Sequence, residues 1–253
     1  MNKLLKIFQR NLFLTFASII GFSCGISLFI YISTFVYWES KADQHHNESK
    51  YIYRVSMDHI FTKKPGLPTL GDFDTKIKEN IPEIIDATHI VYSGKVKIKI
   101  YQDWVIQNRV AFIDSSFFKI FNFKIEKFDD FKNINTPNVA LVSRSFYLNT
   151  FKRDNNIGQP VIEYDNHLIQ IVGVFETNGV SHLNIDLLIS KATLTDSNPF
   201  SNIGLTYIKS INGVSEKSLL LKLNQYSKSI IPHVPDKLGI YLEKLENVFF
   251  PYR

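Results

Sequence analysis

The first pattern along the chain is a long run of apolar positions without any charge. Residues 11–38, NLFLTFASIIGFSCGISLFIYISTFVYW, include 14 that are Leu, Ile, Phe or Val. A helix crosses the bilayer core with about 20 residues. Each of these side chains contributes roughly −0.3 to −0.6 kcal/mol near the membrane centre, so insertion is favoured by roughly 4 to 8 kcal/mol before polar corrections. The run therefore predicts one transmembrane helix.

Three alternatives to a membrane span fit this run less well. A cleaved signal peptide has a shorter apolar core and a small-x-small cleavage site, and neither is apparent. A lipoprotein site at Cys24 is disfavoured, because Gly21 stands three positions before it and apolar sequence continues beyond it. A buried helix of a soluble protein is seldom this long and this uniformly apolar. Cys24 is also the single cysteine, which excludes an internal disulfide.

Small residues recur within the predicted span. Ala17, Gly21 and Gly25 are four positions apart, which places them on one helix face. Such a face lets a second helix backbone approach closely in lipid. We therefore predict that Ala17, Gly21 and Gly25 form an interface with another membrane helix.

After a polar stretch over residues 39–50, strand-like and helix-like patterns alternate. Strands are predicted at 51–57, 95–100, 104–113, 139–143, 160–164, 167–175, 184–190, 205–211 and 239–245. In KVKIKI, the lysines at 95, 97 and 99 should face water while the alternate apolar residues face a core. Two hairpins are expected, one turning at Gln102-Asp103 and one at Asp165-Asn166.

Helical spacing is expected in four places. The first helix should begin at an N-cap Thr69 and stop at Pro82. Its apolar face is predicted to contain Leu70, Phe73, Ile77 and Ile81. Shorter helices are expected at 114–121, capped by Asp114 or Ser115, and at 144–151. The last helix should be opened by Ser215 and bury Leu219, Leu220, Leu223 and Tyr226.

The order of these elements predicts an α+β fold. A β-α-β unit comes first, a second, β-rich unit begins near Asn138, and another β-α-β unit closes the chain. The predicted class is therefore neither all-β nor parallel α/β.

The net charge of +5 is concentrated at the N-terminus. Lys3, Lys6 and Arg10 supply +3 without an acidic residue among the first ten, which leaves +2 for the rest. By the positive-inside rule these three residues place the N-terminus in the cytoplasm and the remainder of the chain on the other side. A nucleic-acid partner is not expected, because its binding would require basic residues gathered on a folded face.

The chain carries no motif for catalysis or cofactor binding. A phosphate-binding loop, G-x-S-x-G and H-E-x-x-H are all absent from the sequence. Asp72, Asp74 and the pair Asp129-Asp130 are interpreted as solvated charges. His45 and His46 with Glu48 could in principle bind a metal, but adjacent histidines point in different directions and no third ligand is suggested nearby. We therefore expect no enzyme activity, no cofactor and no metal site.

Several segments, taken in order, resemble the N-terminal part of MacB/FtsX-like ABC transporter permeases, particularly the type common in Bacteroidota. The chain begins with a basic N-terminus, a span containing GFSCG, a polar link with His46, and then YIYRV. The further similar segments are NRVAFIDSSFFKIFNF, NVALVSRSFYLNTF, IGQPVIEYDNHLIQIVGVFE, SHLNIDLLIS and TYIKSINGVSEKSLLLKLNQY. Together they cover nearly the whole chain.

The resemblance implies a definite organisation. It consists of a cytoplasmic basic N-terminus (1–10), a transmembrane helix (11–38), a juxtamembrane link (39–50) and a MacB-like periplasmic core domain (51–253). Within the core domain, 51–135 and 204–253 would form a porter-like part and 136–203 an inserted β-rich subdomain. The histidines of the link are then interpreted as part of a connector between the span and the first strand.

The resemblance also implies a function. The chain would be a single-pass protein of the cell inner membrane and a non-enzymatic permease-type subunit of an ABC transporter. It would contact membrane lipid, pair as a homodimer or with other permease helices, and work with a cytoplasmic ABC ATPase subunit. Its periplasmic domain would transmit ATPase-driven motion for export across the cell envelope.

One departure from the family pattern leaves an alternative open. A complete permease of this type has three further spans, whereas this sequence shows no second apolar run of adequate length. The chain would then be a split or truncated permease, or a stand-alone derivative. The alternative is a single-span extracytoplasmic module that binds or senses a ligand.

Overall fold

The chain forms two units, Met1–Ala42 and Asp43–Arg253. The computed structural model describes residues 12–40, 43, 46, 48–58, 65–100, 102–127, 133–151, 161–177, 181–194, 202–230 and 239–248. The N-terminal residues Lys3, Lys6 and Arg10 lie outside these ranges.

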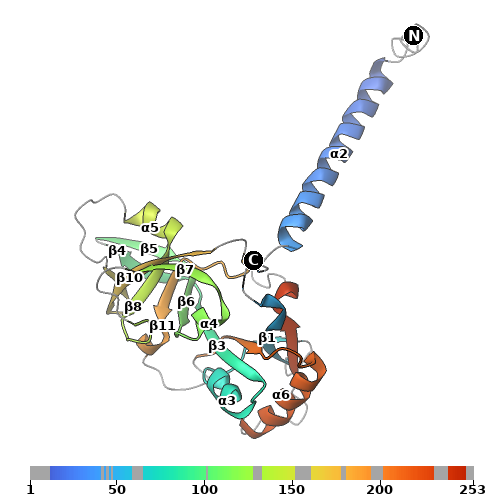
Figure 1. Cartoon of the computed structure of the whole chain (residues 1–253). Helices are drawn as coiled ribbons and strands as arrows, with labels where there is room; N and C mark the ends of the chain where they lie inside the picture. The colour runs from blue at the N-terminus through green and yellow to red at the C-terminus, as the bar shows by residue number, and fades with distance from the viewer. Residues whose placement is uncertain are drawn as a thin grey trace. The chain divides into compact units, whose positions relative to one another are not determined.

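The described residues of the first unit form one long helix, α2 (Leu12–Ser40) (Figure 1). Its stretch Leu12–Tyr37 has a mean hydropathy of 2.1 and no buried residue, so it is long and apolar enough to cross a membrane. The hydroxyls of Ser18 and Ser27 each donate a hydrogen bond of 2.8 Å to the carbonyl four residues earlier. These polar groups are therefore satisfied inside the helix, which removes most of their cost in lipid.

The described residues of the second unit include thirteen strands of one mixed sheet. The strands are β1 (Ile52–Asp58), β2 (Pro65–Leu67), β3 (Ile84–Ser93), β4 (Val96–Ile100), β5 (Asp103–Gln107), β6 (Val110–Ile113), β7 (Phe123–Lys127), β8 (Val139–Ser143), β9 (Val161–Tyr164), β10 (His167–Thr177), β11 (Leu187–Ser190), β12 (Leu205–Ser210) and β13 (Ile240–Lys244). The helices are α3 (Phe73–Asn80), α4 (Phe117–Ile120), α5 (Arg144–Thr150) and α6 (Glu216–Ile230), with 3-10 turns η1 (Ser49–Tyr51), η2 (Lys191–Thr193) and η3 (Leu245–Asn247).

The strand order gives the sheet two halves that meet at β3. The order is β13-β1-β12-β3-β6-β11-β8-β10-β9-β4-β5, with β2 beside β1 and β7 beside β10. Among the described strands, the pairs β10–β8 and β11–β6 are parallel and the other pairs are antiparallel. β3 pairs with β12 through its first residues and with β6 through its last ones, so it belongs to both halves.

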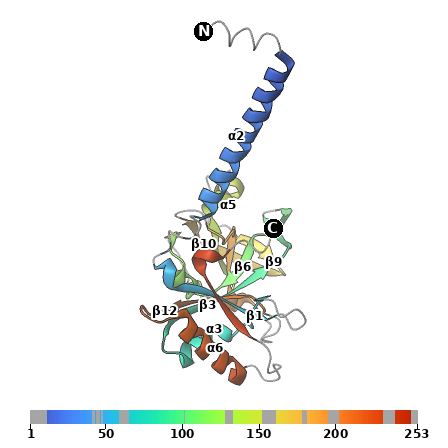
Figure 2. The same ribbon diagram turned by 90° about the vertical axis from the view of Figure 1, so that its right-hand side faces the viewer.

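Three hydrophobic clusters hold the unit together. One lies between α3, α6 and the strands β1, β3, β12 and β13, and Figure 2 shows both helices on that half of the sheet. A second cluster packs α4 against β3, β12 and the β-rich half. The third fills the β-rich half between β4, β6, β8, β9, β10 and β11. β4 thus packs with strands from the predicted insertion, and the predicted boundaries of 51–135 and 136–203 stay a prediction.

Three strands explain the short continuous apolar runs of the sequence. β6, β8 and β11 are buried along their whole length, and their alternate residues enter different hydrophobic clusters. Leu141 lies in one cluster while its neighbours Ala140 and Val142 lie in the other. A strand buried on both faces needs apolar side chains at every position, which produces runs such as VALVS.

The main features predicted from periodicity are confirmed. The class is α+β. The hairpin β9–β10 turns at Asp165 and Asn166, both with positive φ, as a two-residue turn requires. Ser215 accepts a hydrogen bond from the Ser218 amide at the start of α6. In β4, Val96, Ile98 and Ile100 are buried.

Several predicted boundaries were wrong, including that of the short helix α4, which begins at Phe117 after Ser116 and not after Asp114 or Ser115. The first helix begins at Phe73 after Asp72, and Thr69 is not its N-cap. The Thr69 hydroxyl instead lies within hydrogen-bonding distance of Thr206 and of the Gly204 carbonyl, because Thr69 forms a β-bridge with Gly204. The predicted strand 104–113 is two strands, since β5 pairs with β4 while β6 leaves to pair with β3 and β11.

The central strand β3 was not predicted. Its middle residues Ala87, Thr88, His89 and Ile90 are all buried. Two of these four buried residues are polar, so the segment lacks the apolar pattern from which a buried strand is predicted. The His89 ring is within hydrogen-bonding distance of the Thr206 hydroxyl (3.0 Å) and the Asn202 carbonyl (2.9 Å). Burial is the main reason that the pKa of His89 falls to about 4, so the ring is neutral at pH 7.

Asp74 was also interpreted wrongly as a solvated charge. Its side chain is buried at the start of α3, with Lys191 Nζ 3.9 Å away. Burial raises the pKa of Asp74 above its ordinary value. Asp72, by contrast, is partly exposed and forms an ion pair with Lys76.

We predict that Gly204→Ala destabilises the second unit. An added Cβ would lie 2.2 Å from the Ile90 carbonyl oxygen and 2.8 Å from His89 Nε2, so β12 would be pushed away from β3. Overpacking of this kind costs about 1 to 3 kcal/mol. Urea unfolding in detergent, followed by circular dichroism, measures the loss.

The control is Gly94→Ala, where an added Cβ meets nothing within 4 Å. It should leave the unfolding free energy within about 0.5 kcal/mol of wild type. Equal stability of both variants would contradict the tight approach of β12 to β3.

Candidate functional site

Asp43 stands three residues after the end of α2 and is 1% exposed. This burial is unusual for a charged side chain beside a membrane span, because an ionised carboxylate loses most of its hydration there. We refer to Asp43, His46, Ser181, His182 and Tyr207 as the Asp43 anchor.

The Asp43 carboxylate accepts several hydrogen bonds from the segment that precedes β11. The Ser181 hydroxyl donates to Oδ1 at 2.7 Å, and the His182 amide lies 3.2 Å from both oxygens. His182 Nδ1 is 2.6 Å from Oδ2. The carboxylate is thus held by a side-chain hydroxyl, a backbone amide and an imidazole, which together replace lost water.

The same imidazole extends the network into the sheet. His182 Nε2 lies 2.7 Å from the hydroxyl of Tyr207, which is fully buried on β12. Since an ionised carboxylate can only accept, His182 Nδ1 donates to Asp43, and in the neutral ring Nε2 accepts from Tyr207. Asp43 is thereby connected through two hydrogen bonds to a central strand.

His46 fixes the same segment from the other side. Its ring is buried, with Nδ1 accepting a 3.0 Å hydrogen bond from the Asn122 amide and Nε2 3.6 Å from Asp43 Oδ1. The ring packs against Phe121 and Phe123, with centroid distances of 5.3 and 5.8 Å. The His46 amide also donates to the Asp43 carbonyl, which closes a local turn.

The pKa values in the anchor follow from these contacts. Burial would raise the pKa of Asp43, but hydrogen bonds from His182 and Ser181, together with the nearby His46 ring, hold it well below its ordinary value of 3.8. Burial raises the pKa of the Tyr207 hydroxyl well above 10.0. At neutral pH the anchor therefore holds an ionised carboxylate and a protonated phenol.

A second attachment follows directly in sequence. Glu48 forms an ion pair of 2.6 Å with Lys209 on β12, which lowers the pKa of the Glu48 carboxyl. The Tyr51 hydroxyl donates to Asn212 at 2.6 Å. Residues 48–51 are therefore fixed to β12 and the residues after it, the strand that also carries Tyr207.

Two residues of the predicted juxtamembrane link 39–50 are buried, and the link itself stays a prediction. Asp43 and His46 are core residues of the folded domain. His45 lies outside the described residues, and within those described no group of three or more possible ligands could hold a metal ion. The sequence signal that could have found the anchor is the Ser181-His182 pair, which the family resemblance singled out without a role.

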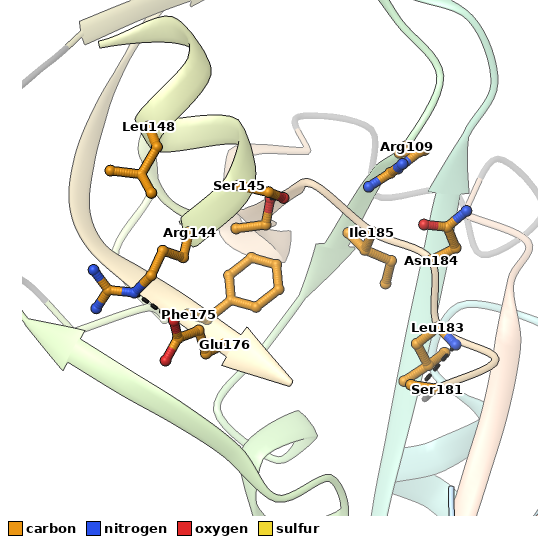
Figure 3. A pocket seen from close by; sticks show the side chains of 11 residues that line it. Arg109, Arg144, Ser145, Leu148, Phe175, Glu176, Ser181, Leu183, Asn184 and Ile185 are labelled. Carbon is orange, nitrogen blue, oxygen red and sulfur yellow. Dashed lines mark hydrogen bonds and ion pairs between the residues drawn. The ribbon is translucent and has the colours of Figure 1, made fainter. Parts of the chain in front are cut away.

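A shallow groove of about 470 Å³ adjoins the anchor at Ser181 (Figure 3). Its apolar lining includes Phe175, Leu183 and Ile185, and Arg144 on one side forms an ion pair of 2.6 Å with Glu176. Further lining residues are Arg109, Ser143, Ser145, Leu148 and Asn184. Figure 3 shows Arg144 and Leu148 on the α5 side and Arg109 and Asn184 opposite. Such a lining can bind a polar or peptide-like group.

The predicted membrane interface residues all lie on α2. Ala17, Gly21 and Gly25 are exposed in the isolated helix, and an added Cβ at either glycine would meet nothing within 4 Å. The face they form is thus open, and its pairing with another helix stays a prediction.

The comparison with known families identifies the chain. A model described as the MacB-like periplasmic core domain matches residues 15–226, which run from within α2 to within α6. The chain belongs to this family. MacB-like periplasmic core domains are parts of ABC transporter permeases. Among curated proteins, none matches the sequence.

Solved structures show the same fold at low sequence identity. A domain of a protein named as a permease from Porphyromonas gingivalis is 17% identical, with a TM-score of 0.66, and the match covers 81% of this chain and 94% of that one. The periplasmic region of MacB from Actinobacillus actinomycetemcomitans is 13% identical, with a TM-score of 0.58 and coverage of 76% and 89%. The extracellular domain of the noncanonic ABC-type transporter YknZ from Gram-positive bacteria is 10% identical, with a TM-score of 0.53 and coverage of 75% and 99%.

We predict that Asp43→Asn lowers the unfolding free energy by about 2 kcal/mol at pH 7, because hydrogen bonds to a buried charge are lost. The folded-state pKa of Asp43 is depressed, so its contribution is complete above pH 3.8 and disappears as the pH falls further. The difference between wild type and variant should therefore shrink below about pH 4. Urea titrations at pH 7 and pH 3 measure it.

Asp72→Asn is the matched control, because it removes a partly exposed carboxylate. It should change the unfolding free energy by less than about 1 kcal/mol at either pH. A pH-independent effect of Asp43→Asn would show that the ionised carboxylate is not what stabilises the anchor.

Proposed function

We propose that the chain is a permease-type subunit or fragment of an ABC transporter, non-enzymatic and without a cofactor, that transmits ATPase-driven motion for export across the cell envelope. The observation that carries this proposal is the single family match over residues 15–226, which includes both helix and domain. Its partners would be a cytoplasmic ABC ATPase subunit and a second copy or other permease helices.

The proposed placement follows from the sequence charges. Lys3, Lys6 and Arg10 would remain in the cytoplasm, α2 would cross the inner membrane once, and the domain would lie in the periplasm. We also propose a porter-like part (51–135 and 204–253) and an inserted β-rich subdomain (136–203).

The Asp43 anchor supplies the mechanical step in this proposal. A displacement at the end of α2 reaches Asp43 after three residues of chain. Moving the Asp43 carboxylate away from the domain would leave a buried charge or unpaired polar groups, which is costly. Residue 43 therefore moves together with the segment 181–186 and with Tyr207 on β12. The anchor thereby fixes residue 43 to the rest of the folded domain.

The groove beside Ser181 supports a second candidate function. A polar-rimmed groove with apolar lining fits a module that binds or senses a ligand outside the cytoplasm. In that case the helix would act as an anchor only, and no ATPase partner would be needed.

Affinity purification from native membranes separates the two functions. The tagged full chain should recover an ABC ATPase subunit, identified by mass spectrometry, because the permease helix contributes to the contact. A matched chain in which residues 1–40 are replaced by an unrelated single-span anchor should lose the ATPase at least tenfold. Absence of an ATPase, or equal recovery with both chains, would favour the binding module.

The predicted helix interface has its own test. Gly21→Ile combined with Gly25→Ile should reduce co-purification of the chain's membrane partners several-fold, because the added side chains prevent close helix approach. Ser23→Ile with Ser27→Ile places the same bulk on the opposite face of α2 and serves as the control. Unchanged assembly in the glycine variant would exclude the small-residue face as an interface.

A further inference from the structure

β5 is an open edge of the sheet. In the described part of the chain it ends the strand order and pairs only with β4. Trp104, Val105 and Ile106 are 59%, 39% and 65% exposed, so apolar side chains face solvent on both sides of the strand. Alternate residues of an antiparallel strand direct their backbone groups away from the neighbouring strand, and here these groups meet no described strand.

The β5 edge has little of the usual protection against pairing beyond its short length and the single charge of Asp103. Natural edge strands carry lysine, proline or a bulge that blocks addition of another strand. The sequence of β5, DWVIQ, contains neither lysine nor proline, and its register with β4 runs over five residues without a shift. Such an edge is a site for strand addition.

The residues of β5 are complementary to themselves. In an antiparallel pair of two β5 strands centred on Val105, Trp104 lies opposite Ile106 of the second copy, and Asp103 lies opposite Gln107 of the second copy. The aromatic–aliphatic pair occurs twice and is of the kind that stabilises sheets. No two like charges face each other in this register.

We propose that β5 pairs with β5 of a second copy of this chain, antiparallel and centred on Val105, so that the two sheets become continuous. The neighbouring charges fit this arrangement. On β4, Lys97 lies opposite Ile106 of β5 and Lys99 lies opposite Trp104 of β5. On β9, Glu163 lies opposite Lys99 of β4. Across the joined sheet, the residues that lie side by side on successive strands would be Glu163, Lys99 and Trp104 of one copy, then Ile106 and Lys97 of the second copy. The twofold symmetry closes the assembly at a dimer.

The small area of the contact means that the dimer is expected only when both copies are held in one membrane. Two strands of five residues bury less than the roughly 800 Å² per partner of a standard stable interface. Pairing is therefore weak between free domains. Anchoring of both copies by α2 in one membrane, which rests on the proposed function, raises their local concentration enough for a weak contact to be populated.

Disulfide trapping in native membrane vesicles tests the register. The full chain with Cys24→Ser removes the natural cysteine, and Val105→Cys then places one thiol opposite itself across the twofold axis. Asp103→Cys is the matched control. Its two thiols would be four residues out of register, about 13 Å apart along the strand, and cannot form a disulfide. Mild oxidation should give at least tenfold more covalent dimer with Val105→Cys than with Asp103→Cys.

Each other outcome overturns the pairing. Equal dimer at both positions would indicate random collision in the membrane, and disulfides to other proteins would indicate a different partner strand. If neither variant gives dimer while both remain folded by circular dichroism, the pairing does not occur.

The result is separable from that of the proposed function. The trapping yield should persist in the Gly21→Ile, Gly25→Ile background and in vesicles without the ATPase. A loss of ATPase recovery therefore leaves this inference intact, and an absence of trapping leaves the transporter proposal intact.

Discussion

The structure depends on keeping an ionised carboxylate buried at the point where the folded domain begins. Asp43 loses its water and is compensated by Ser181, the His182 amide and the His182 ring. Because a buried charge without partners costs several kcal/mol, these groups must stay together while the domain is folded. Residue 43, at the start of the folded domain, is thus held to the sheet by hydrogen bonds and not by hydrophobic contact alone.

This constraint organises the centre of the domain. His182 passes the connection to Tyr207 on β12, and Phe121 packs against both rings, with centroid distances of 6.2 and 5.0 Å. β12 lies between β1 and β3, and β3 in turn pairs with β6 of the β-rich half. A displacement at Asp43 therefore reaches both halves of the sheet through a short chain of packed and hydrogen-bonded groups. That arrangement suits a protein that passes on motion.

Patterns in the sequence predicted the parts of the fold that depend on interactions between residues close together in the chain. The apolar run gave the helix, the Asp165-Asn166 turn gave a hairpin, and VALVS gave a strand buried on both faces. β3 was missed because Thr88 and His89 are buried polar residues, and the His89 ring has its partners, Thr206 and the Asn202 carbonyl, more than 100 positions away in the sequence. The anchor was missed for the same reason, since Asp43 and Ser181 are 138 positions apart. Asp43 lies in a polar stretch of the sequence, and its burial depends on contacts that exist only in the folded domain.

Hydrogen exchange of the full chain in detergent tests the coupling through Asp43 most directly. With Asp43→Asn, the amides of residues 181–186 and of β12 should exchange at least tenfold faster, because the hydrogen bonds from Ser181 and His182 to residue 43 are weakened. The amides of α3, which packs on the far side of β3 from the anchor, should exchange at the wild-type rate. Unchanged protection at residues 181–186 and β12 would contradict the account, because Asp43 would then not hold the start of the domain to its sheet.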